Sequence, residues 1–367
     1  RFADSCAAIA DRKQATVAFI GGSITEMKGY RAKLESWLQA TFPETKFEFV
    51  NAGISSTCST TGAFRLFDDV LSHDPDLLLI EFAVNDDQDA AHSRQAAIRG
   101  LEGIVRQTLQ DHPSTDMVIT YFVNPPMLEI LTRGETPTSI EAHEAVASHY
   151  GVSSVNLAKE VAERIASGTM TWHEYGGTHP AEAGNALAAE MVQDLLETGW
   201  HQALEYGGDW QSVETRLPKK LDENSYDRGR FMVLQSAECD GSWSVGKPDW
   251  AEIAGRLRAR FDDAELLSAS QPGAKLGLKF EGTAVGLYVL AGPDAGKVEF
   301  SVDGKWSGEV DLYHRFSEGL HYPRTVILED ELSRGRHELE LRIGPRGEGE
   351  KGGTAARILA FGINGPP

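Results

Sequence analysis

Four residues in the first half of the chain carry groups suited to acyl transfer: Ser23, Gly53, Asn85 and His179. A serine hydroxyl can attack a carbonyl carbon when a histidine takes up its proton. A glycine N–H and an asparagine amide can hold the negative oxygen of the resulting tetrahedral intermediate. Together these residue types predict ester hydrolysis by a serine nucleophile, provided that the fold brings them together.

Each of these residues also has a purely structural interpretation. Ser23 suits the N-cap of a helix, and Gly53 suits a turn in which it has no chemical role. Asn85 could cap a turn with its neighbour Asp86, and His179 could be a histidine of a surface loop. Single residues therefore do not decide between the two interpretations.

The elements predicted around the four candidates favour the chemical interpretation. The strands that end before Ser23, Gly53 and Asn85 span residues 17–20, 46–50 and 77–82, and the helix that follows His179 spans 180–196. The apolar residues of the first strand favour a buried strand, which two glycines then turn sharply. Because the carboxyl ends of parallel strands meet at one edge of an open sheet, these four segments can converge.

The whole chain predicts two domains of different class. Strands and helices alternate about five times in the first 200 residues, which is typical of an α/β domain with a parallel sheet covered on both faces. The character changes near residues 206–208 to short stretches with period-2 alternation, separated by turn signals such as Asp303-Gly304. We expect a catalytic α/β domain over 1–205 and an all-β, jelly-roll-type sandwich over 206–367.

Short blocks around the four candidates resemble those of a known family. The blocks are residues 21–25 (GGSIT), 51–53 (NAG), 84–86 (VND) and 178–180 (THP). Their order and rough spacing, over about residues 14 to 200, are similar to the four blocks of the SGNH (GDSL-like) hydrolases. The resemblance implies a flavodoxin-like three-layer α/β/α fold and a serine esterase mechanism without metal or cofactor.

The resemblance also implies a role for each candidate. Ser23 would be the nucleophile and would donate its own backbone N–H to the oxyanion hole. Gly53 would give a second N–H, and Asn85 would give its side-chain amide. His179 would be the general base and then the acid that protonates the leaving alcohol.

The sequence departs from the family pattern at two positions. Gly22 stands where many relatives carry an aspartate, which does not affect the nucleophile. The last block usually has an acidic residue three positions before the histidine, and Gly176 stands there instead. Glu174, the nearest acid, is a candidate for the third triad member, although an ordinary solvated carboxylate is the favoured interpretation. A backbone carbonyl or an acid from elsewhere could also orient His179.

Aromatic residues have two interpretations each. Trp172, His173 and Tyr175 precede the candidate histidine, where they could stack on a sugar ring, line an acyl pocket or close the core. In the second domain a larger set could form a sugar-binding platform, or the sandwich core with one or two members exposed. This set comprises Trp243, Trp250, Trp306, Tyr313 and Tyr322.

Composition excludes several classes of partner. The net charge of −20 argues against a nucleic-acid groove or an anionic membrane surface, and no apolar run approaches the length of a membrane span. Cys6, Cys58 and Cys239 lack paired ligand spacing, so no structural zinc site is expected. Cys6 and Cys58 could form a disulfide after export, but three reduced thiols are the favoured interpretation. The start at Arg1 and the family's habits favour an extracellular or periplasmic location, with a cytoplasmic one still open.

We therefore expect a serine ester hydrolase that removes short acyl groups, acetyl above all, from a carbohydrate. The carbohydrate is expected because the second domain resembles the β-sandwich modules of carbohydrate-active esterases, which is an association rather than a derivation. A short-chain lipid or aryl esterase is one alternative. A carbohydrate-binding protein with an impaired catalytic domain is the other, and Gly176 keeps it open. The sequence does not indicate the oligomeric state.

Overall fold

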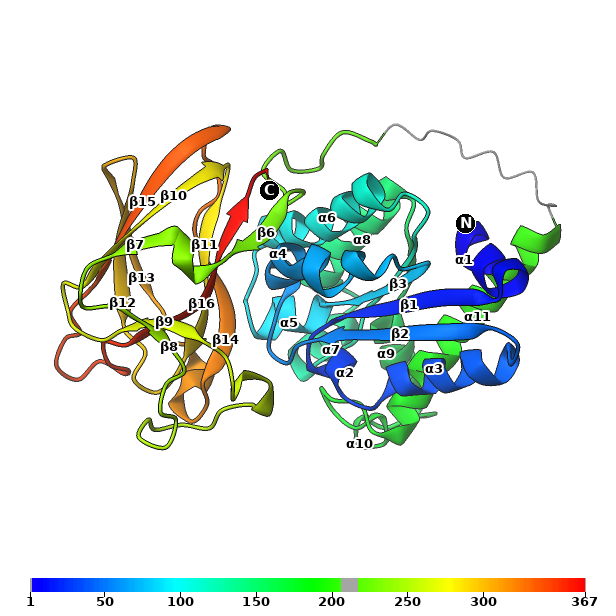
Figure 1. Ribbon diagram of the computed structural model, residues 1–367. Coiled ribbons are helices and arrows are strands. Elements are labelled where there is room, and N and C mark those ends of the chain that lie inside the picture. Colours follow the sequence, from blue (N-terminus) through cyan, green and yellow to red (C-terminus); the bar gives the residue numbers. More distant parts are fainter. Residues whose placement is uncertain (1, 206–216, 367) are drawn as a thin grey trace. The chain divides into compact units, whose positions relative to one another are not determined.

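The computed structural model of the chain describes residues 2–205 and 217–366 (Figure 1). The chain divides into two compact units, Arg1–Asp227 and Arg228–Pro367, and each is described by itself below. The domain boundary expected at 206–208 lies outside the described residues. Residues 217–227, which were expected in the second domain, belong with the first unit.

The first unit is built on a five-stranded parallel sheet with the order β2-β1-β3-β4-β5. Its strands are β1 (Gln14–Gly21), β2 (Lys46–Gly53), β3 (Leu77–Glu81), β4 (Asp116–Thr120) and β5 (Ser153–Val155). This is the strand order of flavodoxin-like folds, so the predicted fold class is confirmed. The strand β3 is buried along its whole length, as expected for a parallel strand covered on both faces.

Helices cover both faces of this sheet (Figure 1). The longer helices are α3 (Tyr30–Thr41), α4 (Ser59–Asp69), α6 (Arg94–Asp111), α8 (Thr138–Tyr150), α9 (Leu157–Ser167) and α11 (Glu182–Glu205). The α3 and α11 helices pack together on one face, and α4, α6 and α8 pack together on the other. The long helices match the predicted apolar periodicity, because each has one face in the core.

The remaining α-helices are short, and apart from a helix beginning near Ser23 the sequence did not predict them. They are α1 (Ala3–Ala7), α2 (Ser23–Glu26), α5 (Ala83–Gln88), α7 (Pro125–Thr132) and α10 (Trp172–Tyr175). Helices of one or two turns do not show enough of the apolar repeat to be recognised. Three of them, α2, α5 and α10, carry or flank the candidate site residues.

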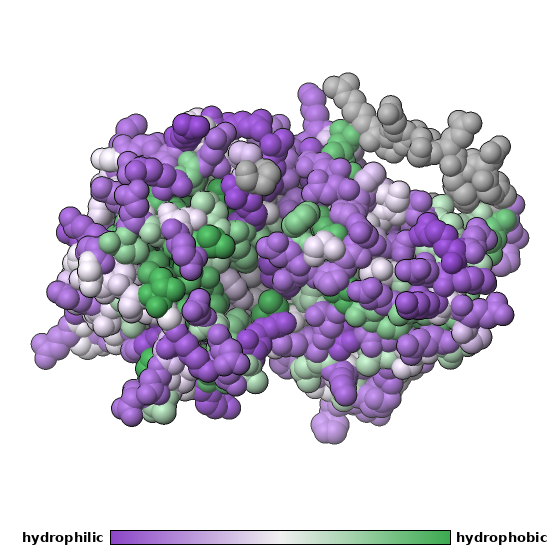
Figure 2. Space-filling view, viewed as in Figure 1, coloured by the Kyte–Doolittle hydropathy of each residue, from purple (hydrophilic) through white to green (hydrophobic). Residues whose placement is uncertain are grey.

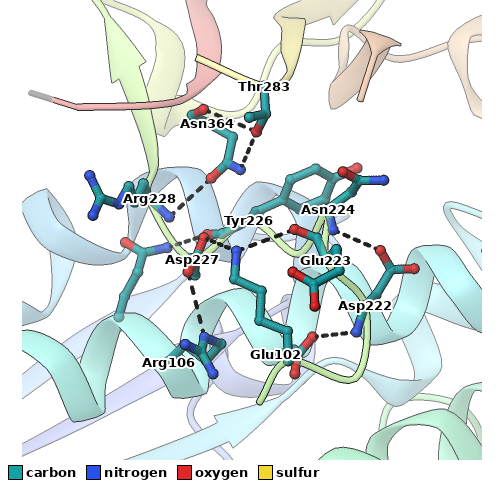
Figure 3. A network of polar contacts seen from close by, with 12 residues as sticks. Glu102, Arg106, Asp222, Glu223, Asn224, Tyr226, Asp227, Arg228, Thr283 and Asn364 are labelled. Carbon is teal, nitrogen blue, oxygen red and sulfur yellow. Dashed lines mark hydrogen bonds and ion pairs between the residues drawn. The ribbon is translucent and has the colours of Figure 1, made fainter. Parts of the chain in front are cut away.

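The segment that leads out of the first unit is bound to α6 (Figure 3). The Glu102 carboxylate accepts a hydrogen bond from the Asp222 backbone N–H at 3.0 Å. The Arg106 guanidinium lies 3.5 Å from the carboxylate of Asp227. These contacts explain why the first unit continues past the predicted boundary.

The second unit is a sandwich of two antiparallel sheets, as the sequence predicts. One sheet has the order β13-β12-β15-β10-β7, and the other has the order β14-β11-β16-β9-β8 with β6 paired to β16. The strands are β6 (Gly229–Met232), β7 (Ala237–Cys239), β8 (Ser244–Gly246), β9 (Leu266–Ala269), β10 (Lys275–Gly282), β11 (Val285–Ala291), β12 (Lys297–Val302), β13 (Lys305–Asp311), β14 (Tyr322–Glu329), β15 (Gly335–Ile343) and β16 (Ala356–Asn364). Alternate residues of β10, β12 and β15 point into a shared apolar core.

The polarity of the surface, the apolarity of the helices and the state of the cysteines can be compared with the sequence expectations. Hydrophilic side chains dominate the face of the first unit seen in Figure 2. Within residues 2–205 and 217–366, no helix has the length and apolarity needed to cross a bilayer. Cys6, Cys58 and Cys239 are all free thiols, so Cys6 and Cys58 are not joined.

Candidate active site

The structure brings Ser23 and His179 together from distant parts of the first unit. The Oγ atom of Ser23 and the Nε2 atom of His179 are hydrogen-bonded at 2.7 Å. Ser23 is half-buried and His179 is exposed, so a substrate can reach both. A serine hydroxyl bonded to an imidazole is the arrangement that general-base activation of a nucleophile requires.

A sharp turn at the end of β1 places Ser23. The strand ends at Gly21, and α2 begins at Ser23, whose N–H belongs to the first helical turn and has no acceptor within the helix. A Cβ atom on Gly21 would lie 2.2 Å from the Thr25 hydroxyl oxygen. Only glycine therefore fits at this end of the strand.

The side chain of Asn85 packs directly against the same turn. A Cβ atom on Gly22 would lie 2.1 Å from Asn85 Oδ1, so an aspartate at position 22 would displace the amide. This contact gives a physical reason for the first departure from the family pattern. Asn85 is 2% exposed, and its Nδ2 donates to Asp89 Oδ2 at 2.8 Å. Asp89 thereby fixes the orientation of the amide and leaves its second N–H for another acceptor.

Gly53 lies beside the turn but is engaged elsewhere. It is paired with Gly21 in the parallel register of β1 and β2. A Cβ atom on Gly53 would lie 2.3 Å from the Glu26 backbone nitrogen, so its closeness to α2 requires a glycine. The N–H of Gly53 donates to Asn51 Oδ1 at 3.1 Å. That hydrogen bond must be exchanged before this N–H can serve an oxyanion.

The loop before α11 carries His179 and makes a tight turn at Gly176. The φ angle of Gly176 is 104°, and a Cβ atom there would lie 2.0 Å from the Ala181 backbone nitrogen. An acidic side chain at position 176 would face both backbone strain and a backbone clash. The usual place of the third triad member is therefore closed to any residue with a side chain.

The structure does not bring Glu174 to His179. The Glu174 carboxylate accepts hydrogen bonds from the Thr171 backbone N–H at 2.7 Å and from its hydroxyl at 2.8 Å. Together with the Thr171 hydroxyl these bonds form a capping box for α10, and they lower the pKa of Glu174. Among the described residues, Ser23 is the only recorded hydrogen-bond partner of His179.

Asn185, which the sequence analysis did not single out, anchors the histidine loop. Its Nδ2 donates to the carbonyl of Pro180, the residue after His179, at 2.6 Å. Its Oδ1 accepts from the Tyr30 backbone N–H at 2.8 Å, which ties the loop to the start of α3. An asparagine within a helical pattern gives no sequence signal for such a role.

The family assignment rests on a direct comparison. Residues 19–187 match the GDSL-like Lipase/Acylhydrolase family. The first unit carries a GDSL-like lipase/acylhydrolase domain. This match covers Ser23, Gly53 and Asn85 together with His179, and it confirms the resemblance read from the four sequence blocks.

Two solved structures of two-domain proteins match this chain over both of its units. A crystal structure of a two-domain esterase active on acetylated mannans, co-crystallised with mannopentaose, matches with a TM-score of 0.76 and 22% identity over 96% of this chain and 92% of that chain. A second crystal structure of a two-domain esterase active on acetylated mannans matches with a TM-score of 0.75 and 22% identity, covering 96% and 93%. These matches establish a shared fold. No curated protein matches the chain at a significant level.

A buried carboxyl group lies behind the turn at Gly21 and Gly22 that precedes Ser23. Glu81, the last residue of β3, is fully buried and pairs with Gly21 in the β1–β3 register. Its carboxyl group accepts from the Gly22 backbone N–H and, at 3.4 Å, from the Thr25 hydroxyl. Burial is the dominant influence and raises the pKa of Glu81 to about 8.

This raised pKa predicts a pH-dependent stability that a glutamine abolishes. Between the ordinary pKa of 4.5 and about 8, the folded state holds a proton that the unfolded state has lost. The free energy of unfolding should therefore fall as pH rises through this window, by at most about 1.4 kcal/mol per pH unit. Glu81→Gln should flatten this dependence, which urea unfolding at about pH 5 and about pH 8 measures. Parallel curves for the variant and the wild type would contradict the assignment.

Glu174→Gln should leave catalysis almost unchanged. The carboxylate serves Thr171 rather than His179, so we expect kcat on a small ester to stay within about two-fold of wild type. The melting temperature should fall slightly, because one oxygen acceptor of the capping box becomes an amide. A ten-fold or larger loss of kcat would show instead that Glu174 reaches His179 during turnover.

Of the aromatic residues Trp172, His173 and Tyr175, one belongs to the core and two are accessible to a substrate. Tyr175 is fully buried and belongs to the core of the GDSL-like domain. The ring of Trp172 lies 5.2 Å from that of Tyr175 and is half-buried, while His173 is exposed. Trp172 and His173 thus remain available to a substrate, and Tyr175 does not.

Proposed function

We propose that the GDSL-like domain is a serine carboxylic ester hydrolase in which Ser23 and His179 act as a catalytic pair. The observation that carries the proposal is the 2.7 Å hydrogen bond between Ser23 Oγ and His179 Nε2. Ser23 Oγ attacks the acyl carbon while Nε2 takes its proton. The proton then passes to the leaving alcohol, and water, deprotonated by His179, hydrolyses the acyl-enzyme.

We assign two donors to the tetrahedral intermediate. The Ser23 N–H lies in the first turn of α2, and the Asn85 amide packs against Gly22 beside it. Donors fixed before the reaction stabilise developing negative charge without reorganising. Gly53 is a third donor only after its N–H leaves Asn51, so we assign it the smallest contribution.

We infer that the pair works without an acid on the second nitrogen of His179, because none of the described acids bonds to it. In a triad the acid holds the imidazole in the productive tautomer and stabilises the imidazolium. Here the exposed ring is open to water, which can solvate the imidazolium, and the loop is held by Asn185. We expect a slower enzyme than one with a complete triad, but an active one.

The proposed substrate is a short acyl ester, acetyl above all, on a carbohydrate. One support is the shared two-unit fold with an esterase active on acetylated mannans. The second is a hollow of about 430 Å³ in the second unit, lined by both polar and apolar side chains on the sheet that contains β13. Such a hollow with an aromatic wall suits a sugar, whose C–H face packs on a ring while its hydroxyls bond to polar groups.

The hollow is built from one row of residues across this sheet. Trp306 pairs with Ser301, Ser301 with Glu340, and Glu340 with Gly277. Trp306 is 65% exposed, whereas the other four aromatics of the predicted platform are buried or half-buried. A Cβ atom on Gly277 would lie 3.9 Å from its nearest neighbouring atom, so the missing side chain leaves space at the base of the hollow. The surrounding carboxylates favour a neutral sugar chain over an acidic one.

Acetate release separates this proposal from its alternatives. We expect acetate from an acetylated neutral polysaccharide and from a nitrophenyl acetate, with little activity on long-chain esters. Higher activity on lipid or aryl esters than on the acetylated polysaccharide would favour the short-chain lipid or aryl esterase. Binding of the polysaccharide with no hydrolysis of any ester would favour a carbohydrate-binding protein with an impaired catalytic domain.

Trp306→Ala should weaken polysaccharide binding without affecting the catalytic pair. Loss of one stacking surface should reduce the affinity about five-fold, or ~1 kcal/mol, in affinity electrophoresis or calorimetry. The kcat on nitrophenyl acetate should not change. Trp306→Phe should retain part of the affinity, and Lys305→Ala, the neighbouring exposed residue on β13, should retain all of it. Equal loss in the Lys305 variant would count against stacking on Trp306.

A further inference from the structure

Cys58, Asp86 and His92 form a compact cluster within the first unit that the ester hydrolysis does not use. Cys58 precedes α4, Asp86 lies in α5, and His92 lies in the loop between α5 and α6. One sulfur, oxygen or nitrogen atom from each lies within 4.8 Å of the others. Cys58 is 6% exposed and Asp86 is fully buried, whereas the side chain of His92 is 13% exposed, so the cluster lies just below the surface.

Hydrogen bonds from Ser59 and His143 fix the carboxylate of Asp86. Asp86 Oδ1 accepts from the Ser59 backbone N–H at 2.8 Å. Asp86 Oδ2 accepts from the Ser59 hydroxyl at 2.6 Å and from Nε2 of the buried His143 at 2.8 Å. Outer hydrogen bonds of this kind orient the ligands of metal sites.

One imidazole nitrogen of the cluster makes no hydrogen bond to a described residue. His92 Nε2 is hydrogen-bonded to the Thr60 hydroxyl at 3.3 Å, which leaves Nδ1 to face the cluster. Nδ1 is buried, has no hydrogen-bond partner among the described residues, and lies 3.5 Å from Asp86 Oδ1. This contact with Asp86 is a long ion pair rather than a hydrogen bond, so a cation bound by both atoms would replace it.

The ligand types suit a soft divalent cation. A thiolate, a carboxylate and an imidazole favour zinc, whereas magnesium and calcium prefer oxygen ligands alone. Around tetrahedral zinc, nitrogen and oxygen ligands lie roughly 3.3 Å apart, close to the observed 3.5 Å.

We propose that Cys58 Sγ, Asp86 Oδ1 and His92 Nδ1 bind a zinc ion, with water as the fourth ligand. On binding, any proton on the thiol or on Nδ1 passes to solvent, because zinc takes the thiolate and the unprotonated nitrogen. The ion would tie the start of α4 to α5, the helix that carries Asn85. Its role is structural, and it takes no part in the reaction at Ser23. The sequence analysis expected no zinc site because these three residues come from separate segments and show no ligand spacing.

Cobalt provides a direct spectroscopic test on the full chain. After treatment with a chelator, one equivalent of Co²⁺ should give a thiolate-to-cobalt charge-transfer band and the intense visible bands of a tetrahedral ion. Added Zn²⁺ should remove both, and Zn²⁺ should raise the melting temperature of the metal-free protein. Both effects should be lost in Cys58→Ser and greatly weakened in His92→Gln.

The other two cysteines are matched controls. Cys6→Ser removes a buried thiol and Cys239→Ser removes an exposed one, and both variants should keep the cobalt bands. Wild-type protein that shows no charge-transfer band with Co²⁺ would overturn the proposal, even if Cys58→Ser failed to fold. A band that disappears only in Cys239→Ser would also overturn it, by assigning the metal to the surface.

Discussion

Ser23→Ala should lower kcat on nitrophenyl acetate by about 10³-fold or more, with the fold intact. The alanine lacks the Oγ atom that forms the acyl-enzyme, and the His179 imidazole alone is a weak nucleophile. Because this pair lacks a third member, the wild-type rate starts lower and the loss should be smaller than in a complete triad. Melting curves should show little change, since Ser23 is half-buried and, among the described residues, its Oγ is bonded to His179 alone.

His179→Ala should cause a loss of similar size, because the two side chains act as a unit. His173→Ala is the matched control, since His173 is an exposed histidine on the neighbouring α10 helix and is not bonded to Ser23. Its kcat should equal that of wild type. If the His173 variant lost as much activity as the His179 variant, the general base would have to be reassigned.

Asn85→Ala should lower kcat by about 10²–10³-fold while changing KM little. The amide donates to charge that exists only in the transition state, so its loss affects the chemical step more than binding. Steady-state kinetics on nitrophenyl acetate, with circular dichroism to verify folding, measure this effect.

Gln88→Ala is the control for the asparagine variant. Gln88 lies on the same short helix and also donates to Asp89 Oδ2, at 3.3 Å, but it does not pack against Gly22. A control loss comparable to that of Asn85→Ala would mean that Asp89, rather than the asparagine amide, is the critical group. Unchanged kcat in Asn85→Ala would remove Asn85 from the oxyanion hole.

The sequence predicted the strands and turns that carry the site residues, because these elements depend on apolar periodicity and on glycines at strand ends. The apolar run of β3 before Glu81 and the glycine pair at the end of β1 are local signals, and parallel pairing then aligns Gly21, Gly53 and Glu81 in one row. The register thus explains why residues far apart in the sequence meet at one edge. The antiparallel sandwich was predictable for the same reason, since β10 and β15 alternate buried and exposed residues.

Contacts between side chains from separate segments were not predictable. The sequence showed that Gly176 lacks an acidic group, but only the structure shows that Ala181 leaves no room for one. The same holds for Asn185, whose amide joins the histidine loop to α3. The cluster of Cys58 with His92 is a further case, because its ligands share neither a motif nor a helix face.

Gly53 shows how far family resemblance extends. The resemblance implies an oxyanion donor at this position, and the register does place Gly53 beside the nucleophile turn. In this structure, however, its N–H is bonded to Asn51, and its lack of a side chain is needed for contact with α2. Both observations indicate that Gly53 is needed for packing against α2, whether or not it also serves as an oxyanion donor.

Covalent labelling tests the central claim, which is that Ser23 is a nucleophile activated by His179. The full chain is treated with a fluorophosphonate, and the adduct is weighed by intact mass spectrometry and located by peptide mapping. We predict one adduct per chain, on Ser23, formed slowly in His179→Ala and absent in Ser23→Ala. An adduct on another residue, or no adduct on the wild-type protein, would contradict the account.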